Sequence, residues 1–273
     1  MSEADLMKTG IIIQARMNSS RLPGKAMFSV VGKPSLEWCV MQCAMMKGKQ
    51  LDRIIIATTT DPEDDVIERI YCGKGDVDWV RRGHPTDLVE RYYIAATVYN
   101  IDTIVRVTGD CPAFGFEIGG ILLKSHVETG ADYTEAERCA IGTSCQVWSR
   151  KALRKLMCAC VEPELTEHMS FFIVNNPDVF NVNRVKLPER LVRSYRLTLD
   201  YMDDFKMIDT LFRQVEDDGG NLFGIEDIFS CLDNHPEIAR INAHCKQTFD
   251  TEWMQAKLKK ENDRIRELLR RQS

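Results

Sequence analysis

The chain has 273 residues, of which 44% are hydrophobic and 28% are charged, a composition typical of a globular protein with a substantial core. Its formal net charge of −5 argues against general binding to nucleic acid or anionic membranes. Because no apolar run is long enough to span a bilayer and the first residues lack a secretory signal pattern, we expect a cytoplasmic protein without a membrane span.

Strand and helix patterns alternate through the first half of the chain. Apolar runs predict buried strands at residues 10–13, 53–58, 77–81 and 103–107. Between them we expect helices at residues 35–47 (capped by Ser35), from residue 61 onward, and at residues 87–99. This order predicts a largely parallel α/β sheet with helices on both faces, and such sheets bind ligands outside the carboxyl ends of their strands.

The second half is less regular. Strands are predicted at residues 131–133, 145–148, 180–185 and 196–200, and helices at residues 149–160, 166–175, 203–217 and 225–234. Thr166 is the expected cap of the helix at residues 166–175. A charged helix at residues 251–271 carries Met254, Leu258, Ile265 and Leu268 nearly in register, either to contact a partner subunit or as an appended surface helix.

Ten cysteines are scattered along the chain. No CxxC pair occurs among them, which disfavours a zinc-ribbon arrangement. In a cytoplasmic chain of this length we therefore interpret them as small buried hydrophobic residues.

The loop after the first strand carries three cations, Arg16, Arg21 and Lys25, with small or polar residues between them. Small neighbours let backbone N–H groups approach phosphate oxygens closely, while the cations offset the negative charge. A turn at Pro23 and Gly24 allows Lys25 to point back into the same cavity. The pattern predicts a polyanion-binding loop; the alternative is a basic surface loop.

Two acids are expected at strand ends. Asp110 follows a buried strand in a Gly-Asp-Cys-Pro turn, and Asp200 ends the predicted strand at residues 196–200. Each alone is most simply a turn former or helix cap. Together, facing a phosphate loop, they suit a hard divalent cation such as Mg²⁺.

Two helix starts carry further candidates. Thr86 or Asp87 can cap the helix that follows, but an Asp and an Arg one turn apart, Asp87 and Arg91, can also bind a base edge and its sugar. His168, at a later helix start, is either a hydrogen-bonded buried residue or a substrate contact.

At this point the chain resembles a known family. The run Gln14-Ala15-Arg16 followed by Ser20-Arg21-Leu22-Pro23-Gly24-Lys25 is similar to the nucleotide-binding signature of cytidylyltransferases that activate sugars, such as the 3-deoxy-manno-octulosonate and acylneuraminate enzymes. The resemblance is stronger to the spore coat polysaccharide SpsF-like branch. It extends over the segments at residues 57–65, 87–93, 107–112, 167–168, 197–200, 235–237 and 241–244.

The resemblance implies a glycosyltransferase-A-like, nucleotide-diphospho-sugar transferase fold. It implies one nucleotidyltransferase domain over residues 1–250, an inserted acceptor and dimerisation region near residues 131–195, and a charged helix at residues 251–273. The activity implied is Mg²⁺-dependent transfer of CMP from CTP to a sugar or sugar-like acid, with release of pyrophosphate, for surface polysaccharide biosynthesis by a homodimer.

The resemblance also implies functions for particular residues. Arg16, Arg21 and Lys25 hold the triphosphate as the catalytic candidates, and Asp110 and Asp200 hold Mg²⁺. The other nucleotide-binding candidates are Gln14, Ala15, Ser20, Asp87, Arg91 and Asp110. Acceptor-binding candidates are Ser144, Gln146, Glu167 and His168.

One segment departs from the family pattern. SpsF-like chains carry an Asp-Gly-x-Asp-x-Glu run, and the two internal acids are replaced here by Ser144 and Gln146. The replacement of carboxylates by neutral groups predicts a different acceptor. Two alternatives to a cytidylyltransferase stay open: a glycosyltransferase of the same fold that consumes a nucleotide sugar, and a non-catalytic nucleotide-binding protein.

Overall fold

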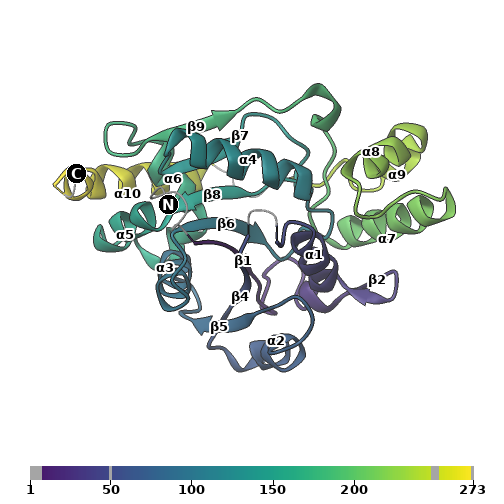
Figure 1. The fold of residues 1–273 in the computed structure, drawn as a ribbon, viewed down its shortest axis with the longest axis horizontal. Coiled ribbons are helices and arrows are strands. Elements are labelled where there is room, and N and C mark those ends of the chain that lie inside the picture. Colours follow the sequence, from purple (N-terminus) through teal and green to yellow (C-terminus); the bar gives the residue numbers. More distant parts are fainter. Residues whose placement is uncertain (1–7, 49–50, 247–251, 272–273) are drawn as a thin grey trace.

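The structure is a computed structural model that describes residues 8–48, 51–246 and 252–271. Seven strands form the main sheet: β1 (Thr9–Gln14), β4 (Arg53–Thr59), β5 (Trp79–Gly83), β6 (Thr103–Thr108), β7 (Tyr133–Ala136), β8 (Gln146–Ser149) and β9 (Val182–Val185). Their order in the sheet is β5-β4-β1-β6-β8-β7-β9 (Figure 1). β1 pairs in parallel with both β4 and β6, and β8 runs antiparallel to its neighbours β6 and β7. The predicted mostly parallel α/β sheet is confirmed.

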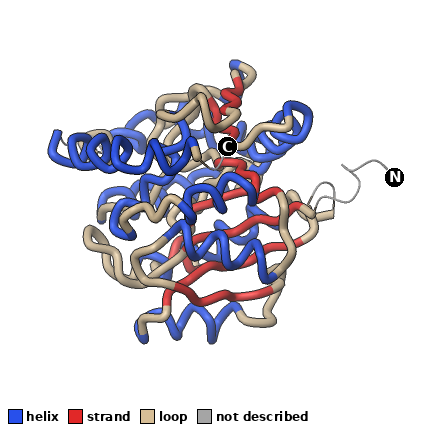
Figure 2. The backbone as a smooth tube through the Cα atoms, turned by 90° about the vertical axis from the view of Figure 1, so that its left-hand side faces the viewer, coloured by secondary structure: helices blue, strands red, loops and turns tan. Residues whose placement is uncertain are grey.

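Helices cover both faces of this sheet, as Figure 2 shows. One core contains side chains of α1 (Ser35–Ala44), α2 (Asp65–Tyr71), α4 (Phe116–Thr129), α7 (Met202–Asp217), α8 (Ile225–Asn234) and α9 (Pro236–Arg240). The other contains side chains of α3 (Leu88–Val98), α5 (Arg150–Cys158), α6 (Met169–Val174) and α10 (Glu252–Arg270). The rest of the secondary structure in the described residues consists of short elements: the hairpin of β2 (Ser29–Val30) and β3 (Lys33–Pro34), and the 3₁₀ turns η2 (Lys25–Met27), η3 (Pro62–Asp64), η4 (Pro163–His168) and η5 (Glu189–Leu191).

The central strands are buried on both sides. Ile11 and Ile13 of β1 belong to the first core, whereas Ile12 between them belongs to the second, and all three are 0% exposed. This alternation follows from the two-residue period of a strand, and explains why the sequence reads as a continuous apolar run. The polar residues that follow such strands are therefore left at the edge of the sheet.

Three sequence predictions are corrected by the structure. Ser35 is the first residue of α1, not its cap; Pro34 precedes the helix and the Ser35 hydroxyl donates to the Lys25 carbonyl, 2.6 Å away. Thr166 lies within η4, and its hydroxyl accepts a hydrogen bond from the backbone N–H of Leu88 at 2.7 Å. Thr166 therefore satisfies a backbone N–H in the first turn of α3 and does not cap α6, which begins at Met169.

The third correction concerns residues 196–200, which do not form a strand. Arg196 makes one isolated bridge with Ile141, and residues 197–200 have no assigned secondary structure. The Leu199 N–H donates to the Asp110 carbonyl at 2.8 Å. Single-residue contacts with two loops, not a ladder, hold this segment beside the strand end at Asp110.

The C-terminal helix α10 packs on its own chain. Leu258, Ile265 and Leu269 are fully buried in the second core, and Met254 and Leu268 pack partly against it. The apolar face of this helix, which the sequence predicted to contact either a partner subunit or the surface of its own chain, packs against its own chain. In Figure 1, α10 lies at the opposite end of the molecule from α7, α8 and α9. None of the helices in the described part of the chain is long and apolar enough to cross a membrane.

Candidate active site

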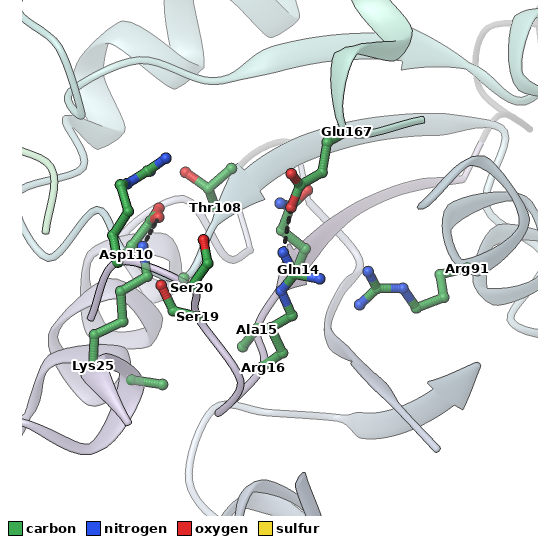
Figure 3. A pocket seen from close by; sticks show the side chains of 13 residues that line it. Gln14, Ala15, Arg16, Ser19, Ser20, Lys25, Arg91, Thr108, Asp110 and Glu167 are labelled. Carbon is green, nitrogen blue, oxygen red and sulfur yellow. Dashed lines mark hydrogen bonds and ion pairs between the residues drawn. The ribbon is translucent and has the colours of Figure 1, made fainter. Parts of the chain in front are cut away.

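A polar pocket opens at the carboxyl ends of β1 and β6 (Figure 3). Its lining comes from the loop after β1, the turn after β6, α3 and η4. The lining residues are Gln14, Ala15, Arg16, Ser19, Ser20, Arg21, Lys25, Ala26, Arg91, Thr108, Gly109, Asp110 and Glu167. Most of the sequence-predicted nucleotide-binding residues therefore surround one cavity.

The loop after β1 folds back on itself before it enters η2. The Gly24 N–H donates to the Met17 carbonyl at 2.8 Å, and Gly24 has a φ of +76°, a backbone conformation that glycine adopts without strain. The buried Leu22 and Ala26 anchor the returning part of the loop. After this turn, Lys25 lines the same pocket as Arg16 and Arg21, as the sequence predicted.

A buried acid that sequence reasoning assigned only to a helix start holds the same loop. One oxygen of Asp64 accepts the Met17 N–H at 2.6 Å, and the other accepts the backbone N–H and the hydroxyl of Thr59. Asp64 is 1% exposed. It ties the end of β4 to the cationic loop, which its acidic sequence neighbourhood did not reveal.

The two acids predicted at strand ends meet around one cation. Lys25 Nζ lies 2.6 Å from Asp110 Oδ2 and 2.8 Å from Asp200 Oδ1. Arg21 lies 2.6 Å from the same Asp200 oxygen, with its guanidinium 5.6 Å from the centre of the Tyr201 ring. Residues far apart in the sequence thus converge on one cluster, which we call the paired cluster: Arg21, Lys25, Asp110 and Asp200.

Electrostatics in this cluster favour the charged forms. Burial alone would raise the pKa of Asp200, but the charges of Lys25 and Arg21 outweigh burial and lower that pKa to about 2. Burial likewise opposes the charge of Lys25, yet Asp110 and Asp200 raise the pKa of its ammonium group above the usual value. Asp200 and the two cations beside it are therefore ionised at neutral pH.

A second, deeper layer positions Asp200. Arg196 donates to Asp200 at 3.1 Å and to Asp204 at 2.9 Å, and Asp204 also accepts the backbone N–H groups of Asp200 and Tyr201 at 3.0 Å each. Asp204 is 0% exposed and receives a further hydrogen bond from Asn242 at 2.8 Å. Sequence reasoning missed these residues because their function depends on contacts between distant segments.

The turn before Asp110 allows β1 and β6 to end close together. The Gly109 N–H donates to the Gln14 carbonyl at 2.8 Å, and a Cβ at residue 109 would lie 2.9 Å from that oxygen. A larger residue would push the two strand ends apart. Glycine at this position therefore places Asp110 over the pocket.

The other end of the pocket contains different cations. Arg16 reaches across to Glu167 at 2.6 Å, joining the loop to η4. Arg91, on α3, is 5% exposed, and its Nε finds no hydrogen-bond partner among the described residues. Burial lowers the pKa of the Arg91 guanidinium. Its stem packs over Gly83, where an added Cβ would lie 2.7 Å from Arg91 Cγ.

Gln14 is held by a chain of side chains beneath the pocket. Its Oε1 accepts hydrogen bonds from Arg106 Nη2 at 2.9 Å and from the Tyr92 hydroxyl at 3.0 Å. Arg106 Nη1 in turn donates to Gln146 Oε1 at 2.6 Å. Because arginine has only donors, the oxygen of Gln14 must face Arg106, and its NH₂ group remains as a donor. Gln146 was predicted to bind the acceptor substrate. It does not line the pocket, and it is connected to the lining residue Gln14 through Arg106.

Several predicted residues lie outside the lining of this pocket. Asp87 caps α3 by accepting the Glu90 N–H at 2.9 Å, which matches the capping alternative. The Ser144 hydroxyl donates to the Cys145 carbonyl at 3.2 Å. His168 is half-buried, and burial lowers the pKa of its imidazole.

The paired cluster passes a simple test for a divalent cation. One carboxylate oxygen of Asp110 and one of Asp200 contact the same cation, the ammonium group of Lys25. A divalent ion at that position would have an oxygen ligand from each of the two residues. Carboxylate oxygens are the donors that hard divalent ions prefer. These two residues therefore fit such an ion.

The strand order of the sheet, with the pocket at its carboxyl edge, is that of the nucleotide-diphospho-sugar transferase fold. The solved structure of CMP:2-keto-3-deoxy-manno-octonic acid synthetase complexed with CTP shares this fold, with a TM-score of 0.56 and 15% identity over 76% of this chain and 99% of that one. The family model described as cytidylyltransferase matches residues 10–191. This chain belongs to the cytidylyltransferase family.

Similar proteins agree with the SpsF-like resemblance. The chain is 35% identical over 242 residues to an uncharacterized protein of Methanocaldococcus jannaschii, covering 88% of this chain and 97% of that protein. It is 30% identical over 207 residues to the spore coat polysaccharide biosynthesis protein SpsF of Bacillus subtilis, covering 74% and 85%. The solved structure of a cytidylyltransferase from Leptospira borgpetersenii matches with a TM-score of 0.76 and 29% identity, over 85% and 97% of the two chains.

Proposed function

We propose that this protein transfers CMP from CTP to a sugar or sugar-like acid and releases pyrophosphate, with Mg²⁺, in surface polysaccharide synthesis. The observation that carries the proposal is the paired cluster, in which two cations for phosphate and two acids for a metal ion are joined by ion pairs; Arg21, Lys25 and Asp110 line the pocket, and Asp200 pairs with the two cations. The polysaccharide setting is supported by the name of the SpsF relative.

The reaction needs positioning and charge stabilisation from the protein. An acceptor oxygen attacks the α-phosphorus, the bond from that phosphorus to the bridging oxygen breaks, and pyrophosphate leaves with its negative charge. Arg21 and Lys25 supply donors for that charge at one end of the pocket. A divalent ion held by Asp110 and Asp200 would add Lewis-acid neutralisation of the phosphates.

The cations of the paired cluster must change partners when the triphosphate binds. Without substrate, Lys25 and Arg21 neutralise Asp110 and Asp200. Phosphate oxygens compete for the same ammonium and guanidinium donors, and this exchange leaves the two carboxylates available to a metal ion. Triphosphate and metal are therefore expected to bind cooperatively.

The choice of cytosine is supported by the donors at the other end of the pocket. Arg91 and the NH₂ group of Gln14 offer hydrogen-bond donors only. Cytosine presents two adjacent acceptors, O2 and N3, to such donors, whereas the N3 of uracil carries a proton and would oppose them. We therefore assign Arg91 and Gln14 to the base.

A pyrophosphate-release screen tests the proposal. The four nucleoside triphosphates are offered in turn with nonulosonates, octulosonates, sugar phosphates and small phosphorylated acids, with Mg²⁺ and again with a chelator. We expect release from CTP with one acceptor class and loss of release on chelation. Absence of release in every combination contradicts the proposal, and tighter binding of UDP-sugars than of CTP favours a glycosyltransferase.

We also propose that the active form is a homodimer, as the family resemblance implies. Light scattering coupled to size-exclusion chromatography measures the mass directly. A mass of one 31.3 kDa chain at working concentration contradicts this.

A further inference from the structure

A group of metal-binding side chains lies outside the pocket, on α7 and α8. The carboxylate of Asp218, the thiol of Cys231 and the imidazole of His235 have ligand atoms that all lie within 4.8 Å of one another. The proposed transferase chemistry does not use this group, although His235 lies in residues 235–237, one of the segments over which the family resemblance extends. We call it the hairpin cluster.

The helices themselves bring these side chains together. Asp218 directly follows the last residue of α7. Cys231 lies in the last turn of α8, and His235 directly follows the last residue of that helix. The backbone N–H of His235 donates to the Cys231 carbonyl at 2.8 Å, and Pro236 then starts α9. The hairpin of α7 and α8 thus directs three donors at one point.

The contacts within the cluster already resemble a coordination sphere. His235 Nε2 lies 3.2 Å from Asp218 Oδ2, and the Cys231 sulfur lies within 4.8 Å of a ligand atom of each of these two residues. The other ring nitrogen, His235 Nδ1, lies 3.5 Å from Glu237 Oε1. A carboxylate at the second nitrogen of a histidine is the usual device that orients a metal-ligating imidazole.

The distances are close to those of a tetrahedral zinc site. With zinc–ligand bonds of about 2.0–2.3 Å, neighbouring ligand atoms of a tetrahedral site lie about 3.3–3.8 Å apart. The nitrogen and oxygen of His235 and Asp218 are already this close, so only small side-chain movements are needed. Water can take the fourth position, since Asp218 and His235 are partly exposed and Cys231 is buried.

The donor chemistry differs from that of the paired cluster. Asp110 and Asp200 offer oxygen only, which suits a hard ion such as Mg²⁺. The hairpin cluster adds sulfur and nitrogen, donors that favour Zn²⁺ over Mg²⁺. We propose that Asp218, Cys231 and His235 form a zinc site that clips α7 to α8.

Such a clip stabilises the helix that carries the positioning acid of the active site. α7 begins at Met202, beside Asp200, and contains the buried Asp204. A metal ion that binds the folded hairpin and not the unfolded chain raises the melting temperature by mass action. The site is therefore structural, and its test does not depend on transferase activity.

Cobalt titration provides the decisive measurement. The full-length protein is stripped with a chelator, transferred to buffer with excess Mg²⁺, and titrated with Co²⁺ alone. Mg²⁺ occupies oxygen-only sites, and only a thiolate ligand gives an intense sulfur-to-cobalt charge-transfer band. We expect this band to saturate at one equivalent and to disappear when Zn²⁺ is added. No such band overturns the proposal.

Matched variants locate the site. Cys231→Ser and His235→Asn should abolish the band, and Glu237→Gln should weaken cobalt binding about tenfold. The control is Cys245→Ser, because Cys245 Sγ also lies beside a histidine, 3.8 Å from His244 Nε2. A band that survives Cys231→Ser, or that is lost in Cys245→Ser, contradicts the assignment.

Melting temperatures test the proposal even if a ligand variant fails to fold. Far-ultraviolet circular dichroism first shows whether each variant keeps its helices. In wild type, saturating Zn²⁺ should raise the melting temperature by about 5 °C, and in Glu237→Gln, which leaves all three ligands in place, the rise should need more Zn²⁺. A melting temperature of the wild type that does not respond to Zn²⁺ overturns the proposal.

Discussion

The two ends of the pocket hold their cations in different ways. At one end, Lys25 and Arg21 are bonded to Asp110 and Asp200 at 2.6–2.8 Å. At the other, Arg16 is paired with Glu167 at 2.6 Å, but the Arg91 guanidinium is buried and its Nε lacks a partner among the described residues. An internally paired charge must exchange partners to bind a substrate, whereas an unpaired donor is ready to receive an acceptor without any exchange.

This difference predicts separate contributions to the reaction. Substitutions in the paired cluster should lower turnover, because its side chains stabilise the negative charge that develops on the leaving pyrophosphate. Changes at Arg91 should affect which base is bound. The following predictions test that separation, from the largest expected effect to the smallest.

Asp110→Asn should have the largest effect. The amide cannot balance Lys25 or bind a divalent ion as strongly as the carboxylate does, so we expect kcat/KM for pyrophosphate release to fall about 10³-fold. The control is Asp65→Asn, which removes a carboxylate paired with Arg82 outside the pocket lining. Equal rates in Asp110→Asn and wild type would refute the metal assignment.

Asp204→Ala should have the next largest effect, which is a decrease in the free energy of unfolding. The substitution leaves Arg196 and two backbone N–H groups without their buried acceptor, which costs about 3 kcal/mol of the free energy of unfolding. Urea denaturation at pH 7 measures this.

The neighbouring Asp203 is the matched control for Asp204. Its carboxylate pairs only at the surface, with Lys206 and His244, so Asp203→Ala should change the free energy of unfolding by less than about 1 kcal/mol. Similar losses in the two variants would mean that the buried network does not hold Asp200 in place.

The low pKa of Asp200 predicts a stability that depends on pH. Its folded pKa of about 2 lies below the ordinary value of 3.8, so ionised Asp200 stabilises the fold above about pH 4. That contribution, about 2 kcal/mol, is lost as the pH falls from 4 to 2. Asp200→Asn should therefore be less stable than wild type at pH 7, with a difference that shrinks toward pH 2.

Urea unfolding of both proteins at intervals between pH 7 and pH 2 measures this difference. Arg21 and Lys25 are unchanged in the variant, so the pH dependence isolates the carboxylate. A difference that stays constant across the range would show that Asp200 is not held ionised by these two cations.

Local patterns were enough to predict the positions of three of the four members of the paired cluster. Arg21 and Lys25 follow a strand buried on both faces, and Asp110 follows another strand through a glycine turn, so the parallel sheet brings them to one edge. Asp200 joins them for a different reason. Its segment is no strand, and isolated contacts with Ile141 and Asp110 place it.

The supporting residues could not be predicted by the same reasoning. The spacing of apolar residues along the sequence shows which face of a helix or strand is buried, but it does not show which loops contact one another in the folded protein. Asp64 sits in an acidic run that suits the first turn of a helix, and only the tertiary structure turns its carboxylate to the Met17 N–H. Arg196 and Asp204 likewise carry no local signal of their ion pair.

Arg91→Ala should have the smallest effect, and a different one. Loss of the guanidinium removes donors for the acceptors of cytosine, so the preference for CTP over UTP in kcat/KM should fall about tenfold, or ~1.4 kcal/mol. Steady-state pyrophosphate release with each nucleotide measures the ratio. Most of the change should appear in KM, because the base takes no part in the bond that breaks.

The exposed Arg81, on β5, provides the matched control, since Arg81→Ala removes the same charge from the protein away from the pocket lining. It should leave the CTP preference unchanged. If Arg91→Ala instead lowers kcat equally for CTP and UTP, then Arg91 acts on the phosphates like Arg21 and Lys25. The contrast between the paired cluster and Arg91 would then be structural only, without separate contributions to turnover and base choice.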